Sequence, residues 1–181
     1  MKNFLFGVFI SAFLIGCSNE KAEENSSATA ATTSTDTKKG GDELLATSEG
    51  DWAKAGLTAF SRGDIEGMTA NYEDTVFYLW SGGDSLRGKK AVQEYYKGRW
   101  ALIDSLNFSD HIILPVNMAV QQSAFAPTGK WTLTWSFAHV KYKTGKKVDF
   151  WVHNVYHHTS SGKVDFVGQY IDRVPINAAS K

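Results

Sequence analysis

Apolar residues recur at helical spacing in the segment that begins near position 48. Ser48 and Asp51 have the spacing of a capping box, and Trp52 and Phe60 fall near one face of the helix that follows. Gly63 is typical of a helix C-terminus. The pattern therefore predicts a first helix that ends near Gly63.

A second, shorter helix is predicted directly afterwards. Asp64 can cap it, and Ile65, Met68 and Tyr72 follow at i, i+3 and i+7 spacing. The β-branched and aromatic stretch from Thr75 to Trp80 then predicts a strand.

The third predicted helix spans about Lys89 to Asp104. Its inner stripe consists of Val92, Tyr95 or Tyr96, and Ile103.

From Asp110 onward the pattern predicts antiparallel strands separated by turn residues. The four strands are Ile112 to Val120 with a break near Pro115, Lys130 to Tyr142, Lys146 to Thr159, and Lys163 to Asp172. Helices first and a meander of strands afterwards indicate an α+β fold with the helices on one face of the sheet.

The hairpin loops determine which side chains share a face. A two- or four-residue loop around Thr144 and Gly145 would turn one alternating set of residues toward the helices. This set is predicted to line a pocket and comprises Trp131, Leu133, Trp135, Phe137, Phe150, Val152, Asn154, Tyr156, Val167, Gln169 and Ile171, together with Trp80 of the earlier strand. An uncharged wall with a few polar groups suits a flat or apolar ligand, although the same aromatics could simply fill the core.

The opposite face of the predicted sheet also carries aromatic residues. Trp151, His153, Phe166 and Tyr170 fall on it. An exposed aromatic patch of this kind predicts an interface, here a homodimer.

The histidines do not predict a metal site. On a strand, His153 and His157 lie four residues apart, roughly 13 Å, and His158 points to the other face. A metal ion needs its ligand nitrogens at about 2 Å, so we expect neither a metal nor another cofactor.

Composition narrows the possible partners. Lys plus Arg and Asp plus Glu both number 19, giving a formal net charge of zero, which argues against a nucleic-acid partner. Cys17 is the single cysteine, so the chain can form neither an internal disulfide nor a multi-cysteine metal site.

The first 16 residues have the pattern of a signal peptide. Lys2 precedes an apolar stretch that is too short to span a bilayer, and Leu14 to Cys17 resembles a bacterial lipobox. The resemblance implies cleavage before Cys17 and lipidation of that residue, which would anchor the protein in the bacterial cell envelope. Residues 17–47, polar and nearly free of bulky apolar residues, then predict a disordered tether to a domain over 48–175, with a tail at 176–181.

Short motifs in the globular part resemble the nuclear transport factor 2-like superfamily, and SnoaL-like proteins within it. These motifs are Arg62-Gly63-Asp64-Ile65, Tyr72-Glu73-Asp74, Leu86-Arg87-Gly88-Lys89, and Gly162-Lys163-Val164 leading to Tyr170 and Asp172. The resemblance implies a cone-shaped fold in which a curved sheet encloses an apolar pocket. The superfamily includes isomerases, epoxide hydrolases, polyketide cyclases and binding modules, so the resemblance alone does not assign a reaction.

The resemblance also implies where catalytic groups would lie. The oxyanion-hole acid of the isomerases falls on Asn154, and the pocket acid of the hydrolases and cyclases falls on Gln169. The Arg and Asp that accompany the hydrolase acid fall on Trp135 and Phe137. We therefore expect a non-catalytic pocket for a small apolar or aromatic ligand. The alternative is a SnoaL-like cyclase, isomerase or hydrolase whose acid lies elsewhere, with Asp84 and Tyr95 as candidates.

Overall fold

The computed structural model describes residues 41–181. Cys17, the predicted leader and most of the predicted tether lie outside the described residues. The described part of the chain forms one compact unit. Its elements are β1 (Glu43–Leu44), the 3-10 helix η1 (Thr47–Gly50), α1 (Asp51–Ser61), α2 (Ile65–Met68), β2 (Tyr72–Trp80), β3 (Ser85–Arg87), α3 (Lys89–Trp100), β4 (Ile103–Met118), β5 (Gly129–Tyr142), β6 (Lys147–His158), β7 (Val164–Tyr170) and α4 (Arg173–Ala179).

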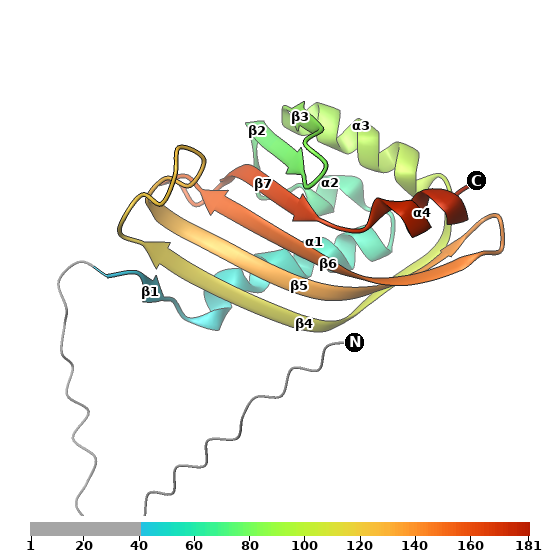
Figure 1. Cartoon of the computed structure of the whole chain (residues 1–181), viewed down its shortest axis with the longest axis horizontal. Coiled ribbons are helices and arrows are strands. Elements are labelled where there is room, and N and C mark those ends of the chain that lie inside the picture. Colours follow the sequence, from blue (N-terminus) through green and yellow to red (C-terminus); the bar gives the residue numbers. More distant parts are fainter. Residues whose placement is uncertain (1–40) are drawn as a thin grey trace, which may run out of the picture. The chain divides into compact units, whose positions relative to one another are not determined.

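Seven strands form a single sheet in the order β1-β4-β5-β6-β7-β2-β3. Every neighbouring pair is antiparallel except β2 and β7, which are parallel. Figure 1 shows the long strands β4 to β7 bending around α1 and α2, with α3 near the β2 and β3 end. The predicted α+β class, with helices on one face of a curved sheet, is confirmed.

The core lies between this face of the sheet and the helices. Near α3 it contains Ile65, Val76 and Val92, all almost fully buried. Near α4 it contains Val140, Val152 and other apolar residues of β4 to β6. Apolar burial on this inner face provides the main driving force for the observed packing.

Helix α3 is shorter than its pattern predicts. It ends at Trp100, and Ile103, expected on the helix, is the first residue of β4. Strand β4 runs through Pro115 without the expected break. It bends instead at two register shifts, one of which contains Asp110 with φ +52°. A bulge of this kind lets a long strand curve around the helices.

The folded domain is also longer than predicted at both ends. Glu43 and Leu44, expected in the tether, pair with β4. The segment expected as a tail contributes most of α4, which Asp172 caps by accepting a hydrogen bond from the Val174 amide at 2.9 Å. Ile176 and Ala179 of this helix are buried in the core. The short apolar sequence of α4 gives little helical signal by itself, and tertiary packing decides its structure.

Candidate functional site

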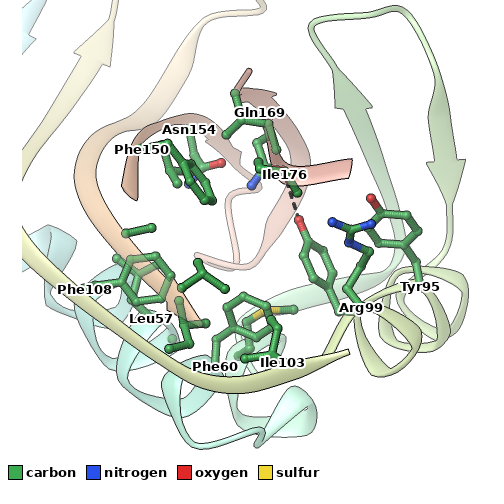
Figure 2. A pocket seen from close by; sticks show the side chains of 18 of the residues that line it. Leu57, Phe60, Tyr95, Arg99, Ile103, Phe108, Phe150, Asn154, Gln169 and Ile176 are labelled. Atoms are coloured by element: carbon green, nitrogen blue, oxygen red, sulfur yellow. Dashed lines mark hydrogen bonds between the residues drawn. The ribbon is translucent and has the colours of Figure 1, made fainter. Parts of the chain in front are cut away.

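The helices and the inner face of the sheet enclose a cavity of about 120 Å³. A cavity of about 150 Å³ can hold benzene, so this one matches a small single-ring molecule. Its apolar wall consists of Trp52, Ala53, Gly56, Leu57, Phe60, Met68, Ile103, Leu106, Phe108, Ala138, Val140, Phe150, Val152, Ile171 and Ile176. Figure 2 shows Leu57, Phe60, Ile103 and Phe108 gathered at one end of this cavity.

Strand β5 presents a different set of side chains to the cavity than predicted. Lys143, Thr144 and Gly145 form a three-residue hairpin loop, closed by the hydrogen bond from the Tyr142 amide to the Lys146 carbonyl at 2.9 Å. Gly145 has φ +86°, the left-handed conformation such a loop uses. An odd loop shifts the register by one residue and turns every β5 side chain to the other face.

The prediction for four pocket residues on β5 is therefore wrong. Trp131, Leu133, Trp135 and Phe137 pair with the outward-facing residues of β6, and none of them lines the cavity. The inner-face positions of β5 are instead occupied by small or aliphatic residues: Thr132, Thr134, Ser136, Ala138 and Val140. These small side chains leave the space in which the cavity forms.

On β6 and beyond, the structure brings most of the remaining expected residues together. Phe150, Val152, Asn154, Tyr156, Gln169 and Ile171 all line the cavity. Trp80 and Val167 do not line it, but both are buried in the core beside it.

Two side-chain amides face the cavity from neighbouring strands. The Gln169 Oε1 accepts hydrogen bonds from Trp80 Nε1 at 2.9 Å and from the Tyr96 hydroxyl at 3.2 Å. The Tyr96 and Tyr78 hydroxyls are in turn 2.6 Å apart. This chain of bonds fixes the orientation of the Gln169 amide.

The side-chain amide of Asn154 has fewer hydrogen bonds to the protein than that of Gln169. Its side chain is 4% exposed, yet its Oδ1 atom has no hydrogen-bond partner within residues 41–181. The indole N–H of Trp52, which also lines the cavity, is likewise buried without a partner in the described chain. Unpaired buried polar groups are costly, and two at one cavity point to a bound molecule that supplies the missing hydrogen bonds.

Four tyrosines of the wall are kept neutral by burial. Burial raises the pKa of Tyr72, Tyr78, Tyr96 and Tyr156 above the ordinary value near 10. Each hydroxyl therefore remains protonated around neutral pH and acts as a neutral hydrogen-bonding group.

The cavity reaches the surface between α3 and α4. Asn177 is the one exposed residue among those that line it, and Arg99 and Arg173 flank it. Arg173 donates to both carboxylate oxygens of Asp84 at 2.6 Å. This bonding holds the pKa of Asp84 below its ordinary value, so Asp84 is poorly suited to act as a general acid.

Comparison with known proteins identifies the domain. A family model described as a SnoaL-like domain matches residues 53–165. The chain belongs to the SnoaL-like family. Among curated protein sequences, none matches this chain significantly.

Solved structures with the same fold resemble the SnoaL-like domain at low sequence identity. A putative polyketide cyclase from Xanthomonas campestris matches with TM-score 0.57 and 16% identity, covering 72% of this chain and 95% of the other. An LEH-like epoxide hydrolase from M. tuberculosis matches with TM-score 0.54 and 19% identity, covering 74% and 90%. An NTF2-like protein of unknown function from Burkholderia pseudomallei matches with TM-score 0.55 and 14% identity, covering 72% and 95%. At these identities the likeness shows the fold alone.

Among residues 41–181, no side chain that lines this SnoaL-like cavity is a carboxylate. Asn154 and Gln169, where the family resemblance implies acids, face the cavity and are neutral amides. Trp135 and Phe137, where it implies an accompanying Arg and Asp, are on the other face of the sheet. Tyr95, the other residue considered for catalysis, does line the cavity.

The predicted interface residues lie on the outer face of the SnoaL-like sheet. Trp151 and Tyr170 are exposed there, and His153 stacks on Trp135 with ring centroids 4.4 Å apart. Phe166 packs beside Trp131 on the same face. The register of β5 thus places Trp131, Leu133, Trp135 and Phe137 on the same outer face, where Trp131 is buried under its neighbours.

Ser109, His139 and Asp149 form a hydrogen-bonded chain at the edge of that outer surface. Ser109 Oγ is 3.1 Å from His139 Nε2, and His139 Nδ1 is 3.0 Å from Asp149 Oδ1. The Ser109 hydroxyl also lies 2.7 Å from Asp110 Oδ2, which competes with His139 for its proton. The side chains of His139 and Asp149 are 41% and 57% exposed and none of these residues lines the cavity, so this hydrogen-bonded group is open to water.

Within residues 41–181, no three His, Cys, Asp or Glu side chains are grouped closely enough to hold a metal ion. None of the helices in this part of the chain combines the length and apolarity needed to cross a bilayer.

Proposed function

We propose that this SnoaL-like domain binds a small, largely apolar ligand in its cavity without performing acid–base chemistry on it. The observation that carries the proposal is the composition of the wall. Apart from two arginines, every lining side chain is apolar or a neutral hydrogen-bonding group. General acid–base catalysis needs a group whose pKa is near the working pH, and the raised tyrosine pKa values do not provide one.

The unpaired groups indicate how the ligand is oriented. A ligand acceptor can bind Trp52 Nε1 and a ligand hydroxyl can donate to Asn154 Oδ1, the two buried atoms of the described chain without partners. The apolar residues at the other end of the cavity contact the ring. A few polar contacts in an apolar cavity of this size are typical of a small-molecule binding site.

Calorimetric titration with benzyl alcohol, a single ring with one hydroxyl, tests this proposal. Ala138 is 1% exposed and lines the cavity, so Ala138→Leu fills the space and should abolish binding. Ala55→Leu, a matched change at an exposed position on α1 outside the cavity, should leave binding unchanged. Equal binding by the wild type and Ala138→Leu would show that the ligand does not occupy the cavity.

A homodimer across the outer face of the sheet is a second part of the proposal. Ile112, Leu114, Trp151 and Tyr170 are exposed there although they are large and apolar. A second copy presents the same aromatic surface, and a two-fold axis would pack one on the other.

We also propose that Cys17 carries the lipid anchor of this domain in the bacterial cell envelope. The support is the sequence alone: the short apolar leader, the lipobox-like residues before Cys17 and the polar segment after them. Mass spectrometry of the protein extracted from cells should find acyl chains on Cys17, and Cys17→Ala should release the protein from the membrane fraction. An unmodified Cys17 in the extracted wild type would refute the anchor.

A further inference from the structure

Arg99 lies on the cavity wall without a carboxylate partner. Within residues 41–181 its guanidinium meets neutral side chains: Nη1 is 3.5 Å from the Asn177 Oδ1, and the group also interacts with the Tyr142 hydroxyl. No Asp or Glu side chain of the described chain lies within salt-bridge distance of it. A guanidinium group has five N–H donors, so most of those on Arg99 are free to bind another group.

Arg173 on the same rim provides an internal comparison. Asp84 binds its guanidinium through both carboxylate oxygens and neutralises its charge. Within the part of the chain that the structure describes, the lining residues therefore leave one positive charge without a carboxylate partner, that of Arg99.

The position of Arg99 suits the charged end of a ligand. Its side chain is partly buried, and Figure 2 shows it rising from α3 beside Tyr95. Asn177, the exposed lining residue, is its hydrogen-bond partner, so the guanidinium lies at the point where the cavity opens.

From these contacts we infer that the ligand is an aromatic or compact apolar monocarboxylate whose carboxylate binds Arg99. This inference rests on the proposed function and names the class of ligand. The planar guanidinium matches a carboxylate through two parallel hydrogen bonds. Because Arg99 is a single positive charge without a carboxylate partner, it selects a ligand with a single negative charge. The ligand carboxylate stays beside Arg99 where the cavity opens, since burying it deeper without a partner would be costly.

Benzoate and benzyl alcohol distinguish this inference from simple apolar binding. They share a ring and a similar size. Only benzoate is charged at neutral pH, and only benzyl alcohol can donate a hydrogen bond to Asn154 Oδ1, so a preference for benzoate must come from its charge. In calorimetric titrations of the full-length chain at low salt, benzoate should bind roughly ten- to a hundredfold more tightly, the range of a charge-assisted hydrogen bond. Salt at about 0.5 M should weaken benzoate binding and leave benzyl alcohol binding unchanged.

Arg99→Gln should remove the preference for benzoate while preserving benzyl alcohol binding, which also verifies that the variant is folded. Arg62→Gln, a matched change at an exposed position outside the cavity, should retain the preference. If the wild type binds both probes equally, or if Arg99→Gln keeps the preference, the carboxylate inference is wrong and apolar binding stands. If the wild type binds neither probe, the proposed function fails with it.

Discussion

Asn154 on β6 and Gln169 on β7 are direct partners in the antiparallel register, so both amides face the same cavity. Their hydrogen bonding differs. Gln169 Oε1 accepts two hydrogen bonds from the protein, whereas Asn154 Oδ1 accepts none within the described chain. Gln169 therefore contributes to the stability of the fold, and Asn154 remains available to a ligand.

Replacing Asn154 with alanine should weaken ligand binding without destabilising the domain. The loss of one buried hydrogen bond costs about 1–3 kcal/mol, or roughly five- to a hundredfold in affinity. The free energy of unfolding should not fall by the same amount, because Oδ1 has no protein partner to lose. Benzyl alcohol titration and urea unfolding measure the two effects. Unchanged affinity would remove Asn154 from the binding site.

Gln169→Leu should affect mainly the stability of the domain, whereas Asn154→Ala should affect mainly ligand binding. It leaves Trp80 Nε1 and the Tyr96 hydroxyl without their shared acceptor, which should lower the free energy of unfolding by about 1–3 kcal/mol. Urea unfolding tests this, with Gln122→Leu at an exposed loop position as the matched control. Equal stability of the two variants would mean that the Gln169 bonds contribute nothing.

His158 should make the stability of the domain depend on pH. Burial lowers its pKa from the ordinary value of 6.5, and its ring contacts Thr132 Oγ1 at 2.9 Å and packs against Trp52. Below pH 6.5 the His158 side chain is protonated in the unfolded chain but remains neutral in the folded chain. The contribution of neutral His158 to the free energy of unfolding is therefore fully present above pH 6.5 and is lost as the pH falls.

Thermal unfolding between pH 7.5 and 5 measures this dependence. The midpoint should fall with acidification, and His158→Gln should show a shallower fall. The midpoint of His158→Gln should still depend on pH to some extent, because burial also lowers the pKa of His111. An unchanged slope in His158→Gln would assign the pH dependence to other groups.

Trp151→Glu tests the proposed dimer. Trp151 is 48% exposed on the outer face, and a carboxylate there would be buried against its symmetry mate. Sedimentation should find dimers for the wild type and monomers for the variant. Val174→Glu on α4, an equally drastic change at an exposed position on the helical side, should remain dimeric. A wild-type protein that is monomeric at high concentration would contradict the proposal.

The sequence predicts α1, α2, α3, the run of antiparallel strands and the helix-covered sheet, because apolar spacing and turn residues are local signals. It predicts the inner face of β6 and β7 for the same reason. It does not predict β3 or the parallel pairing of β2 with β7, which joins residues far apart in the sequence. The face of β5 depends on one loop residue: Gly145 closes a three-residue turn, and an even loop would have placed Trp135 on the inner face. Loop length is poorly determined by a stretch such as Tyr142 to Lys147 in which several polar residues suit a turn.

The predicted pocket omits Arg99 because it consists of strand residues alone. The signal for Arg99 is helical spacing: it follows Tyr95 by four residues and Tyr96 by three on α3, and all three line the cavity. The contribution of α4 has no such signal, since its role follows from packing onto β6 rather than from its own sequence.

Native mass spectrometry of the protein purified from its own cells tests the central claim most directly. We expect a bound molecule of single-ring size in the wild type and none in Ala138→Leu. After prolonged incubation with fresh protein, the same molecule should be recovered chemically unchanged. Conversion of the released molecule into a product by the wild-type chain, with a bell-shaped dependence of the rate on pH, would contradict a binding role and assign the cavity to catalysis.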